Sequence, residues 1–206
     1  MKRQQTDEII KFLKKNIEPL EDNAYGLGYR ASVYLTDGTF LSCVIFRNPK
    51  AVVDLAMRRF KEEQSGKGVF NRSSGLGYYE IVKTFVTNGN CINDYDIERV
   101  DKSKFAFPLT ILRQIRGETT MGWTGFAAKM KDGKYFGYGT TFHFDFFQMP
   151  DGYSVEDIEE IINHSYVLEN GKLRSYRESN QTLTDEWKNA VIYRERPFFE
   201  CYIDNL

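Results

Sequence analysis

Histidine and cysteine are scarce in this sequence. Its 206 residues include 2 histidines and 3 cysteines, and the cysteines lie far apart at Cys43, Cys91 and Cys201. No CxxC pair and no Cys/His ligand spacing occurs, so the sequence offers no zinc site. We therefore expect neither a metal nor a cofactor. The odd number of dispersed cysteines is typical of free thiols in a reducing compartment.

Long hydrophobic runs are also lacking. None approaches the roughly 18 apolar residues that a membrane-spanning helix requires. The first ten residues, MKRQQTDEII, become polar too early to form the apolar core of a signal peptide. We therefore expect a soluble, cytoplasmic protein that does not enter a membrane.

An excess of positive charge is absent as well. The 28 basic and 29 acidic residues give a formal net charge of -1. Proteins that bind nucleic acid through the phosphate backbone usually carry a basic face. Nucleic acid is therefore not an expected partner.

Familiar catalytic signatures are missing. The sequence contains no GxSxG elbow, no HExxH pair and no Walker loop. The acidic residues Asp94, Asp96 and Glu98 lack the glycine and the distal glutamate of an EF-hand loop, which favours a solvated loop. These absences favour a protein that binds rather than catalyses.

Aromatic residues, by contrast, are abundant. Phe, Tyr and Trp make up 15% of the chain, beside 41% hydrophobic and 28% charged residues. The last two values are typical of globular proteins, and aromatic side chains dominate cores and interfaces. The length predicts a single compact domain over residues 1–206, with two related halves, about 1–100 and 101–206, as an alternative.

Helical periodicity appears at three places. A first helix is predicted with Thr6 as its N-cap, a second with Asn48 as its N-cap, and a third after a capping box that begins at Ser154. The third would carry His164 near its C-terminus. A strand over 78–86 and a last helix over 184–191 are also predicted. The first helix is expected to bury Ile9, Ile10, Leu13, Ile17 and Leu20.

Three Asp-Gly or Asn-Gly pairs predict hairpins, at residues 37–38, 132–133 and 170–171. Such pairs are typical of two-residue type I′ turns. A two-residue loop in the first hairpin predicts the pairs Leu35 with Phe40, Val33 with Ser42, Ala31 with Val44, and Tyr29 with Phe46. In the second it pairs Trp123 with Phe142 and Met121 with Phe144 and sets Gly122 opposite His143.

The first two hairpins suggest an internal repeat. Their Asp-Gly pairs lie 95 residues apart, and each is followed by a predicted helix. At this offset Leu35 corresponds to Met130 and Phe40 to Tyr135. The alternative is a chance recurrence of a common turn. The sequence thus predicts an α+β fold of antiparallel hairpins, with helices on one face and possible duplication of a hairpin-plus-helix unit.

The strand after the second hairpin carries the candidate site. Thr141, His143 and Asp145 alternate along it and would share one face, where histidine could act as a base. A polar, hydrogen-bonded patch without chemistry is the alternative. The predicted binding residues are Trp123, Thr124, Tyr138 and His143.

Two functions follow from these features. The first is a non-enzymatic module that binds another protein, for interaction or inhibition, because aromatic residues are enriched at interfaces. The alternative is a small hydrolase-like enzyme that uses His143 and Asp145.

Overall fold

The computed structural model describes residues 3–22, 25–64, 90–141, 144–176 and 189–206. The predicted strand over 78–86, most of the predicted helix over 184–191, and His143 lie outside these ranges. Within them, no helix is long and apolar enough to span a membrane. The chain forms two compact units. Unit 1 comprises residues 1–102 and 198–206, and unit 2 comprises residues 103–197.

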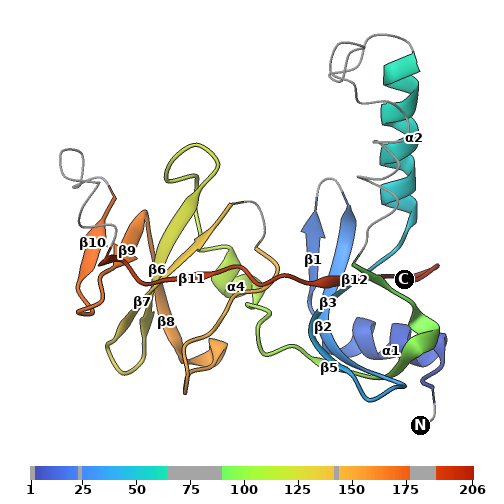
Figure 1. Cartoon of the computed structure of the whole chain (residues 1–206), viewed down its shortest axis with the longest axis horizontal. Helices are drawn as coiled ribbons and strands as arrows, with labels where there is room; N and C mark the ends of the chain where they lie inside the picture. Colours follow the sequence, from blue (N-terminus) through green and yellow to red (C-terminus); the bar gives the residue numbers. More distant parts are fainter. Residues whose placement is uncertain (1–2, 23–24, 65–89, 142–143, 177–188) are drawn as a thin grey trace. The chain divides into compact units, whose positions relative to one another are not determined.

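Unit 1 is built around a mixed sheet with the strand order β1-β2-β3-β12-β4, and β5 also pairs with β2 (Figure 1). The closing strand β12 runs parallel to β3 and β4, whereas β1, β3 and β5 run antiparallel to β2. The elements of this unit are α1 (Thr6–Asn16), β1 (Pro19–Asp22), β2 (Gly26–Leu35), β3 (Phe40–Arg47), α2 (Lys50–Gln64), β4 (Cys91–Ile92), the 3-10 turn η2 (Asp94–Asp96), β5 (Ile97–Lys102) and β12 (Phe199–Tyr202).

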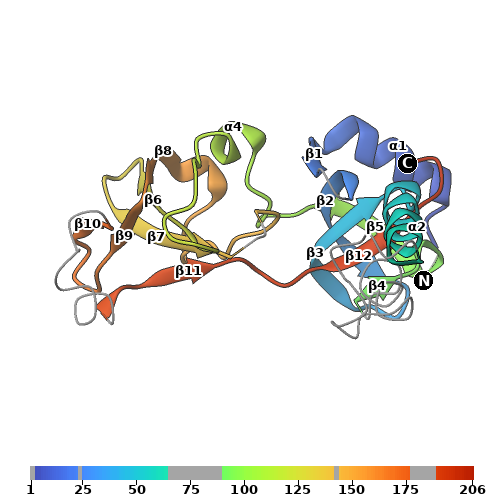
Figure 2. The same ribbon diagram turned by 90° about the horizontal axis from the view of Figure 1, so that it is seen from above.

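The first predicted helix is confirmed as α1, which lies on one side of this sheet (Figure 2). Its N-cap is Gln5 rather than Thr6, because Gln5 and Glu8 form a reciprocal capping box. The fully buried Ile9 and Leu13 pack against aliphatic residues of β2, β3 and β5. The second predicted helix is confirmed as α2, where Asn48 Oδ1 accepts the Lys50 N–H at 2.9 Å.

Unit 2 contains a smaller mixed sheet with the order β11-β7-β6-β8, and a separate β9-β10 pair. Its core is aromatic, with Phe107, Phe126, Tyr138 and Phe147 buried together. The elements are α4 (Leu109–Leu112), β6 (Thr124–Met130), β7 (Tyr135–Thr140), η3 (Val155–Asp157), β8 (Ile158–Asn163), β9 (Ser165–Val167), β10 (Leu173–Ser175) and β11 (Ile192–Arg194).

The mixed α/β character is as predicted, but the expectation of purely antiparallel sheets is wrong. Strands β11 and β12 each lie parallel to the second strand of a hairpin, β7 and β3 respectively. Turn signals reveal only pairings between strands that are neighbours in sequence. Both parallel strands come from the last fifteen residues of the chain, far from the hairpins they join.

All three predicted hairpins form, but each loop has three residues instead of two. In the first, Leu35 N–H donates to Thr39 O, and Gly38 N–H donates to Leu35 O. This is a type I turn closed by a glycine with positive φ, here 88°. Asp37 Oδ1 accepts the Thr39 N–H at 2.8 Å, an Asx turn that favours this loop. The loops that end at Gly133 and Gly171 repeat the pattern.

The extra loop residue changes the predicted registers. Ala31–Val44 and Tyr29–Phe46 pair as predicted, but an irregularity after Ala31 makes Tyr34 the partner of Phe40. In the second hairpin every partner shifts by one residue. A shift of one exchanges the faces of a strand. Residues Phe126, Ala128, Met130, Phe136 and Tyr138 therefore share the core face.

The third predicted helix is wrong. Only a 3-10 turn follows the capping box of Ser154 and Asp157, and β8 comes next. Ile158 and Ile161 are both buried because Glu159 is an extra residue, a β-bulge, between the partners of Met130 and Lys129. The bulge separates two core residues by three positions and so imitates helical spacing. His164 accordingly follows a strand and has φ 54°.

Units 1 and 2 share a local arrangement of strands. In each, a hairpin pairs through its first strand with a bulged strand that follows a 3-10 turn, and through its second with a parallel strand. In both units the hairpin loop donates one hydrogen bond to the last residue of the 3-10 turn. Thr36 N–H donates to Asp96 O in unit 1, and Lys131 N–H donates to Asp157 O in unit 2. A helix follows the hairpin in unit 1 alone among the described residues. Duplication of the units stays a hypothesis.

Candidate interaction surface

A row of three side chains crosses unit 1 at the loop end of its hairpin. Tyr34 of β2 pairs in register with Arg99 of β5 on one side and Phe40 of β3 on the other. The rings of Tyr34 and Phe40 have centroids 4.6 Å apart, and the Arg99 guanidinium lies 4.3 Å from the Tyr34 centroid. We call Arg99, Tyr34 and Phe40 the aromatic row.

The aromatic row is accessible. Phe40 is 49% exposed, and the side chain of Arg99 is 58% exposed. Val33, the neighbour of Tyr34, is fully buried in the core, so alternation along the strand directs Tyr34 to the opposite face. A cation on an aromatic face at an exposed site contributes about 0.5–1 kcal/mol. The row is thus a pre-arranged aromatic and cationic surface.

Acidic groups border the aromatic row. Asp101 accepts a hydrogen bond from Arg99 Nε at 2.9 Å. Asp37 lies at the fully exposed tip of the loop, where its hydrogen bonds to Thr39 lower the pKa of its carboxyl. Asp37 therefore remains charged at neutral pH, and the tip presents a negative group beside the aromatic rings.

The equivalent row in unit 2 has a different chemistry. Lys129 takes the place of Tyr34 and pairs in register with Glu160 and Tyr135. Its Nζ lies 2.9 Å from an oxygen of Glu159, and this hydrogen bond raises the pKa of Lys129. Lys129 is therefore already paired, and the row in unit 2 has one aromatic ring, Tyr135, where the row in unit 1 has two.

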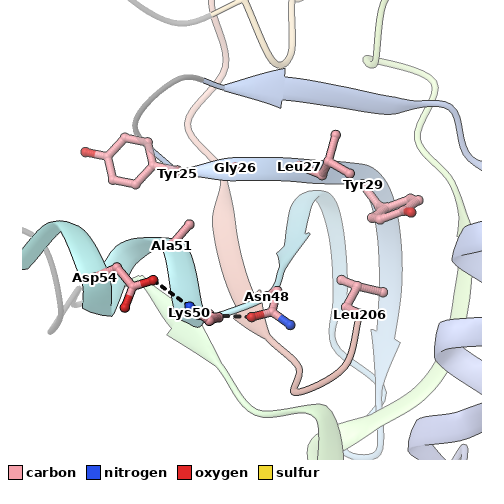
Figure 3. A pocket seen from close by; sticks show the side chains of 9 residues that line it. All are labelled: Tyr25, Gly26, Leu27, Tyr29, Asn48, Lys50, Ala51, Asp54 and Leu206. Carbon is pink, nitrogen blue, oxygen red and sulfur yellow. Dashed lines mark hydrogen bonds and ion pairs between the residues drawn. The ribbon is translucent and has the colours of Figure 1, made fainter.

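A pocket of about 290 Å³ also lies in unit 1, between the start of β2 and the start of α2 (Figure 3). Leu27 at its edge is 51% exposed, and Lys50 binds Asp54 at 2.8 Å. The volume is at the lower limit of sites for small molecules, about 300–1,000 Å³. Its lining comprises Tyr25, Gly26, Leu27, Tyr29, Asn48, Lys50, Ala51, Asp54 and Leu206.

A buried charged pair lies on the sheet of unit 1. Arg47 and Glu200 are 3% and 6% exposed, and Arg47 Nε lies 3.7 Å from Glu200 Oε1. Arg47 also donates to Gly26 O, and the Tyr202 hydroxyl donates to Glu200 at 3.2 Å. Burial, and then the charge of Glu200, raises the pKa of Tyr202, which keeps this hydroxyl a donor. These contacts link β2, β3 and β12, so the pair helps to hold the sheet of unit 1 together.

Two of the four predicted binding residues are buried. Tyr138 is 1% exposed within the aromatic core, and Thr124 is 7% exposed, so their side chains serve packing. Trp123 is half-buried, with the Arg194 guanidinium 4.7 Å from its ring centroid. Gly122 lies in a turn with φ 73°, and the adjacent Met121 is 99% exposed, so neither continues the strand as predicted.

The predicted catalytic residues remain a hypothesis. Asp145 is 8% exposed, and Thr141 Oγ1 accepts a hydrogen bond from Arg194 at 3.4 Å. The third member, His143, lies outside the described residues. None of the three cysteines is in a disulfide, and Cys43 and Cys201 are buried whereas Cys91 is exposed.

Sequence reasoning missed the aromatic row for an identifiable reason. A two-residue loop would pair Phe40 with Leu35 and send Tyr34 to the other face, whereas the observed loop pairs Phe40 with Tyr34. Arg99 stood in a segment interpreted as an acidic loop. The Asx hydrogen bond at Asp37 is the signal that favours the longer loop.

No protein-family model matches this chain, and no curated protein or solved structure is similar enough to match it.

Proposed function

We propose that the chain is a non-enzymatic module that binds another protein in the cytoplasm through the aromatic row of unit 1. The observation that carries the proposal is the arrangement in which the exposed Arg99 and Phe40 both contact the ring of the half-buried Tyr34. Tyr and Arg are the residues most often found at interface hot spots. Their arrangement on a sheet lowers the side-chain entropy lost on binding.

The charge of the chain supports a protein as the partner. The net charge of -1 and the acidic border of the row disfavour a polyanion at this face. The hydrolase-like alternative depends on His143, which lies outside the described residues. Binding therefore remains the function best supported by the described residues.

The test uses an internal control. Tagged full-length protein, Phe40→Ala and Tyr135→Ala are compared by quantitative affinity capture, since these residues hold equivalent places in the two hairpins. Loss of a hot spot weakens binding by more than about 1 kcal/mol, or roughly fivefold. We expect proteins captured by the wild type to be lost with Phe40→Ala and retained with Tyr135→Ala.

Circular dichroism shows whether both variants remain folded. Equal capture by Phe40→Ala and wild type would remove the aromatic row as the binding surface. Equal losses from both folded variants would show a general effect of aromatic truncation and would also refute the proposal.

A further inference from the structure

Glu98 carries an unusual carboxylate beside the aromatic row. It is the bulge residue of β5, between Ile97 and Arg99, whose partners on β2 are Leu35 and Tyr34. Its Oε2 is buried and has no hydrogen-bond partner among the described residues. A buried carboxylate oxygen without a partner is costly, so an additional donor at this position would be stabilising.

Unit 2 shows how the same position is satisfied. Its bulge residue is Glu159, between Ile158 and Glu160, and it forms a 2.9 Å ion pair with Lys129. Lys129 occupies the register position that Tyr34 occupies in unit 1. Unit 1 therefore repeats the bulge glutamate but replaces its lysine with an aromatic ring. The cation that completes the pair in unit 2 has no counterpart at that position.

We propose that the aromatic row receives a partner segment with a lysine or arginine next to a large apolar side chain. The partner's cation would pair with the carboxylate of Glu98, which is half-buried as a whole residue, and its apolar group would lie on Tyr34 and Phe40. This inference rests on the proposed function and specifies the chemistry of the partner. A cation that meets both a carboxylate and aromatic faces gains from each.

The charges around the row agree with a basic segment. Asp37 at the loop tip, Asp96 behind the loop and Asp101 beside Arg99 lie at this end of the sheet. Arg99 and Asp101 form an ion pair in which each compensates the charge of the other. The uncompensated negative charge at this end of the sheet therefore comes from Glu98, Asp37 and Asp96. Complementary charges of this kind increase association rates and depend on ionic strength.

The test uses two fluorescein-labelled peptides, one of alternating lysine and leucine and one of alternating glutamate and leucine. Their binding to full-length protein is measured by fluorescence anisotropy at low salt and at about 0.15 M salt. Four variants are compared with the wild type, and the second pair is the matched control from unit 2. They are Glu98→Gln, Phe40→Ala, Glu159→Gln and Tyr135→Ala.

We expect the lysine peptide to bind more tightly than the glutamate peptide, and salt to weaken its binding. Glu98→Gln and Phe40→Ala should each weaken it roughly fivefold or more, and the unit 2 variants should leave it unchanged. Binding of both peptides that depends on Phe40 but not on Glu98 would overturn the inference and leave the proposed function standing. Binding of neither peptide, or binding independent of Phe40, would overturn both.

Discussion

Units 1 and 2 place the same strand arrangement around different side chains. One core pair of the hairpin register is small and aliphatic in unit 1, Ala31 with Val44, but aromatic in unit 2, Phe126 with Tyr138. The exposed rows are reversed, with rings in unit 1 and a lysine–glutamate pair in unit 2. At these matched positions, aromatic side chains lie at the surface row of unit 1 and in the core of unit 2.

This contrast distinguishes the interactions that fix the backbone from the side chains that are exposed on the surface. Loop hydrogen bonds, bulges and the parallel closing strand recur in both units, although few of the side chains around them do. The side chains at equivalent positions are therefore free to differ in their chemistry. Substitutions at matched positions can test this separation.

The largest loss of stability is expected from a substitution in the core of unit 2. Phe126 is fully buried and stacks on Tyr138 with centroids 5.3 Å apart. Phe126→Ala should destabilise unit 2 by about 3–5 kcal/mol through lost burial and a residual cavity. Val33→Ala in the core of unit 1 should cost less, about 2 kcal/mol, since fewer buried carbons are removed.

Hydrogen exchange can assign these losses to each unit. Phe126→Ala should accelerate exchange in β6 and β7 while β2 and β3 keep their protection. Equal loss of protection in both sheets would show that the units unfold as one and would contradict their description as separate compact units.

A smaller effect is expected at the buried charges of unit 1. Glu200→Ala would leave Arg47 buried without its carboxylate, and removal of one partner of a buried pair costs about 3 kcal/mol. We take the lower end of the known range because the Nε–Oε1 distance is 3.7 Å. Tyr202→Phe, the control, removes only one hydrogen bond and should cost about 1 kcal/mol. Denaturant unfolding that gives equal losses would argue against a structural role for the ion pair.

The smallest effect concerns the two loop aspartates. Hydrogen bonds lower the pKa of both Asp37 and Asp132 below 3.8, but at Asp132 the first cause is the hydroxyl of Tyr153. Tyr153→Phe should therefore raise the pKa of Asp132 and leave that of Asp37 unchanged. Because both values are depressed, the contribution of each carboxylate is present above pH 3.8 and is lost as the pH falls through the lowered pKa. Carboxyl carbon NMR titrations measure both groups, and a parallel change in Asp37 would refute the assignment.

The positions of the loops could be predicted from the sequence better than the registers of the strands that they connect. The three Gly-containing loops and the first two helices follow from residue preference, and all of them form. The helix predicted after Ser154 failed because the bulge at Glu159 gives a strand the spacing of a helix. Only a partner strand can reveal a bulge, and β6 lies far from β8 in sequence. The same limit hid the aromatic row, which needs three strands to be in register.

The position of β12 has a consequence for synthesis on the ribosome. Residues 103–197 lie between the two segments that build unit 1, so unit 2 emerges complete while the sheet of unit 1 still lacks its parallel strand. Until residues 199–202 have been synthesised, one edge of β3 has no strand partner and Arg47 has no ion pair with Glu200. During synthesis, unit 2 would then complete its fold before unit 1, although unit 1 begins earlier in the sequence. The unit proposed to bind a partner would thus complete its sheet after unit 2 has formed.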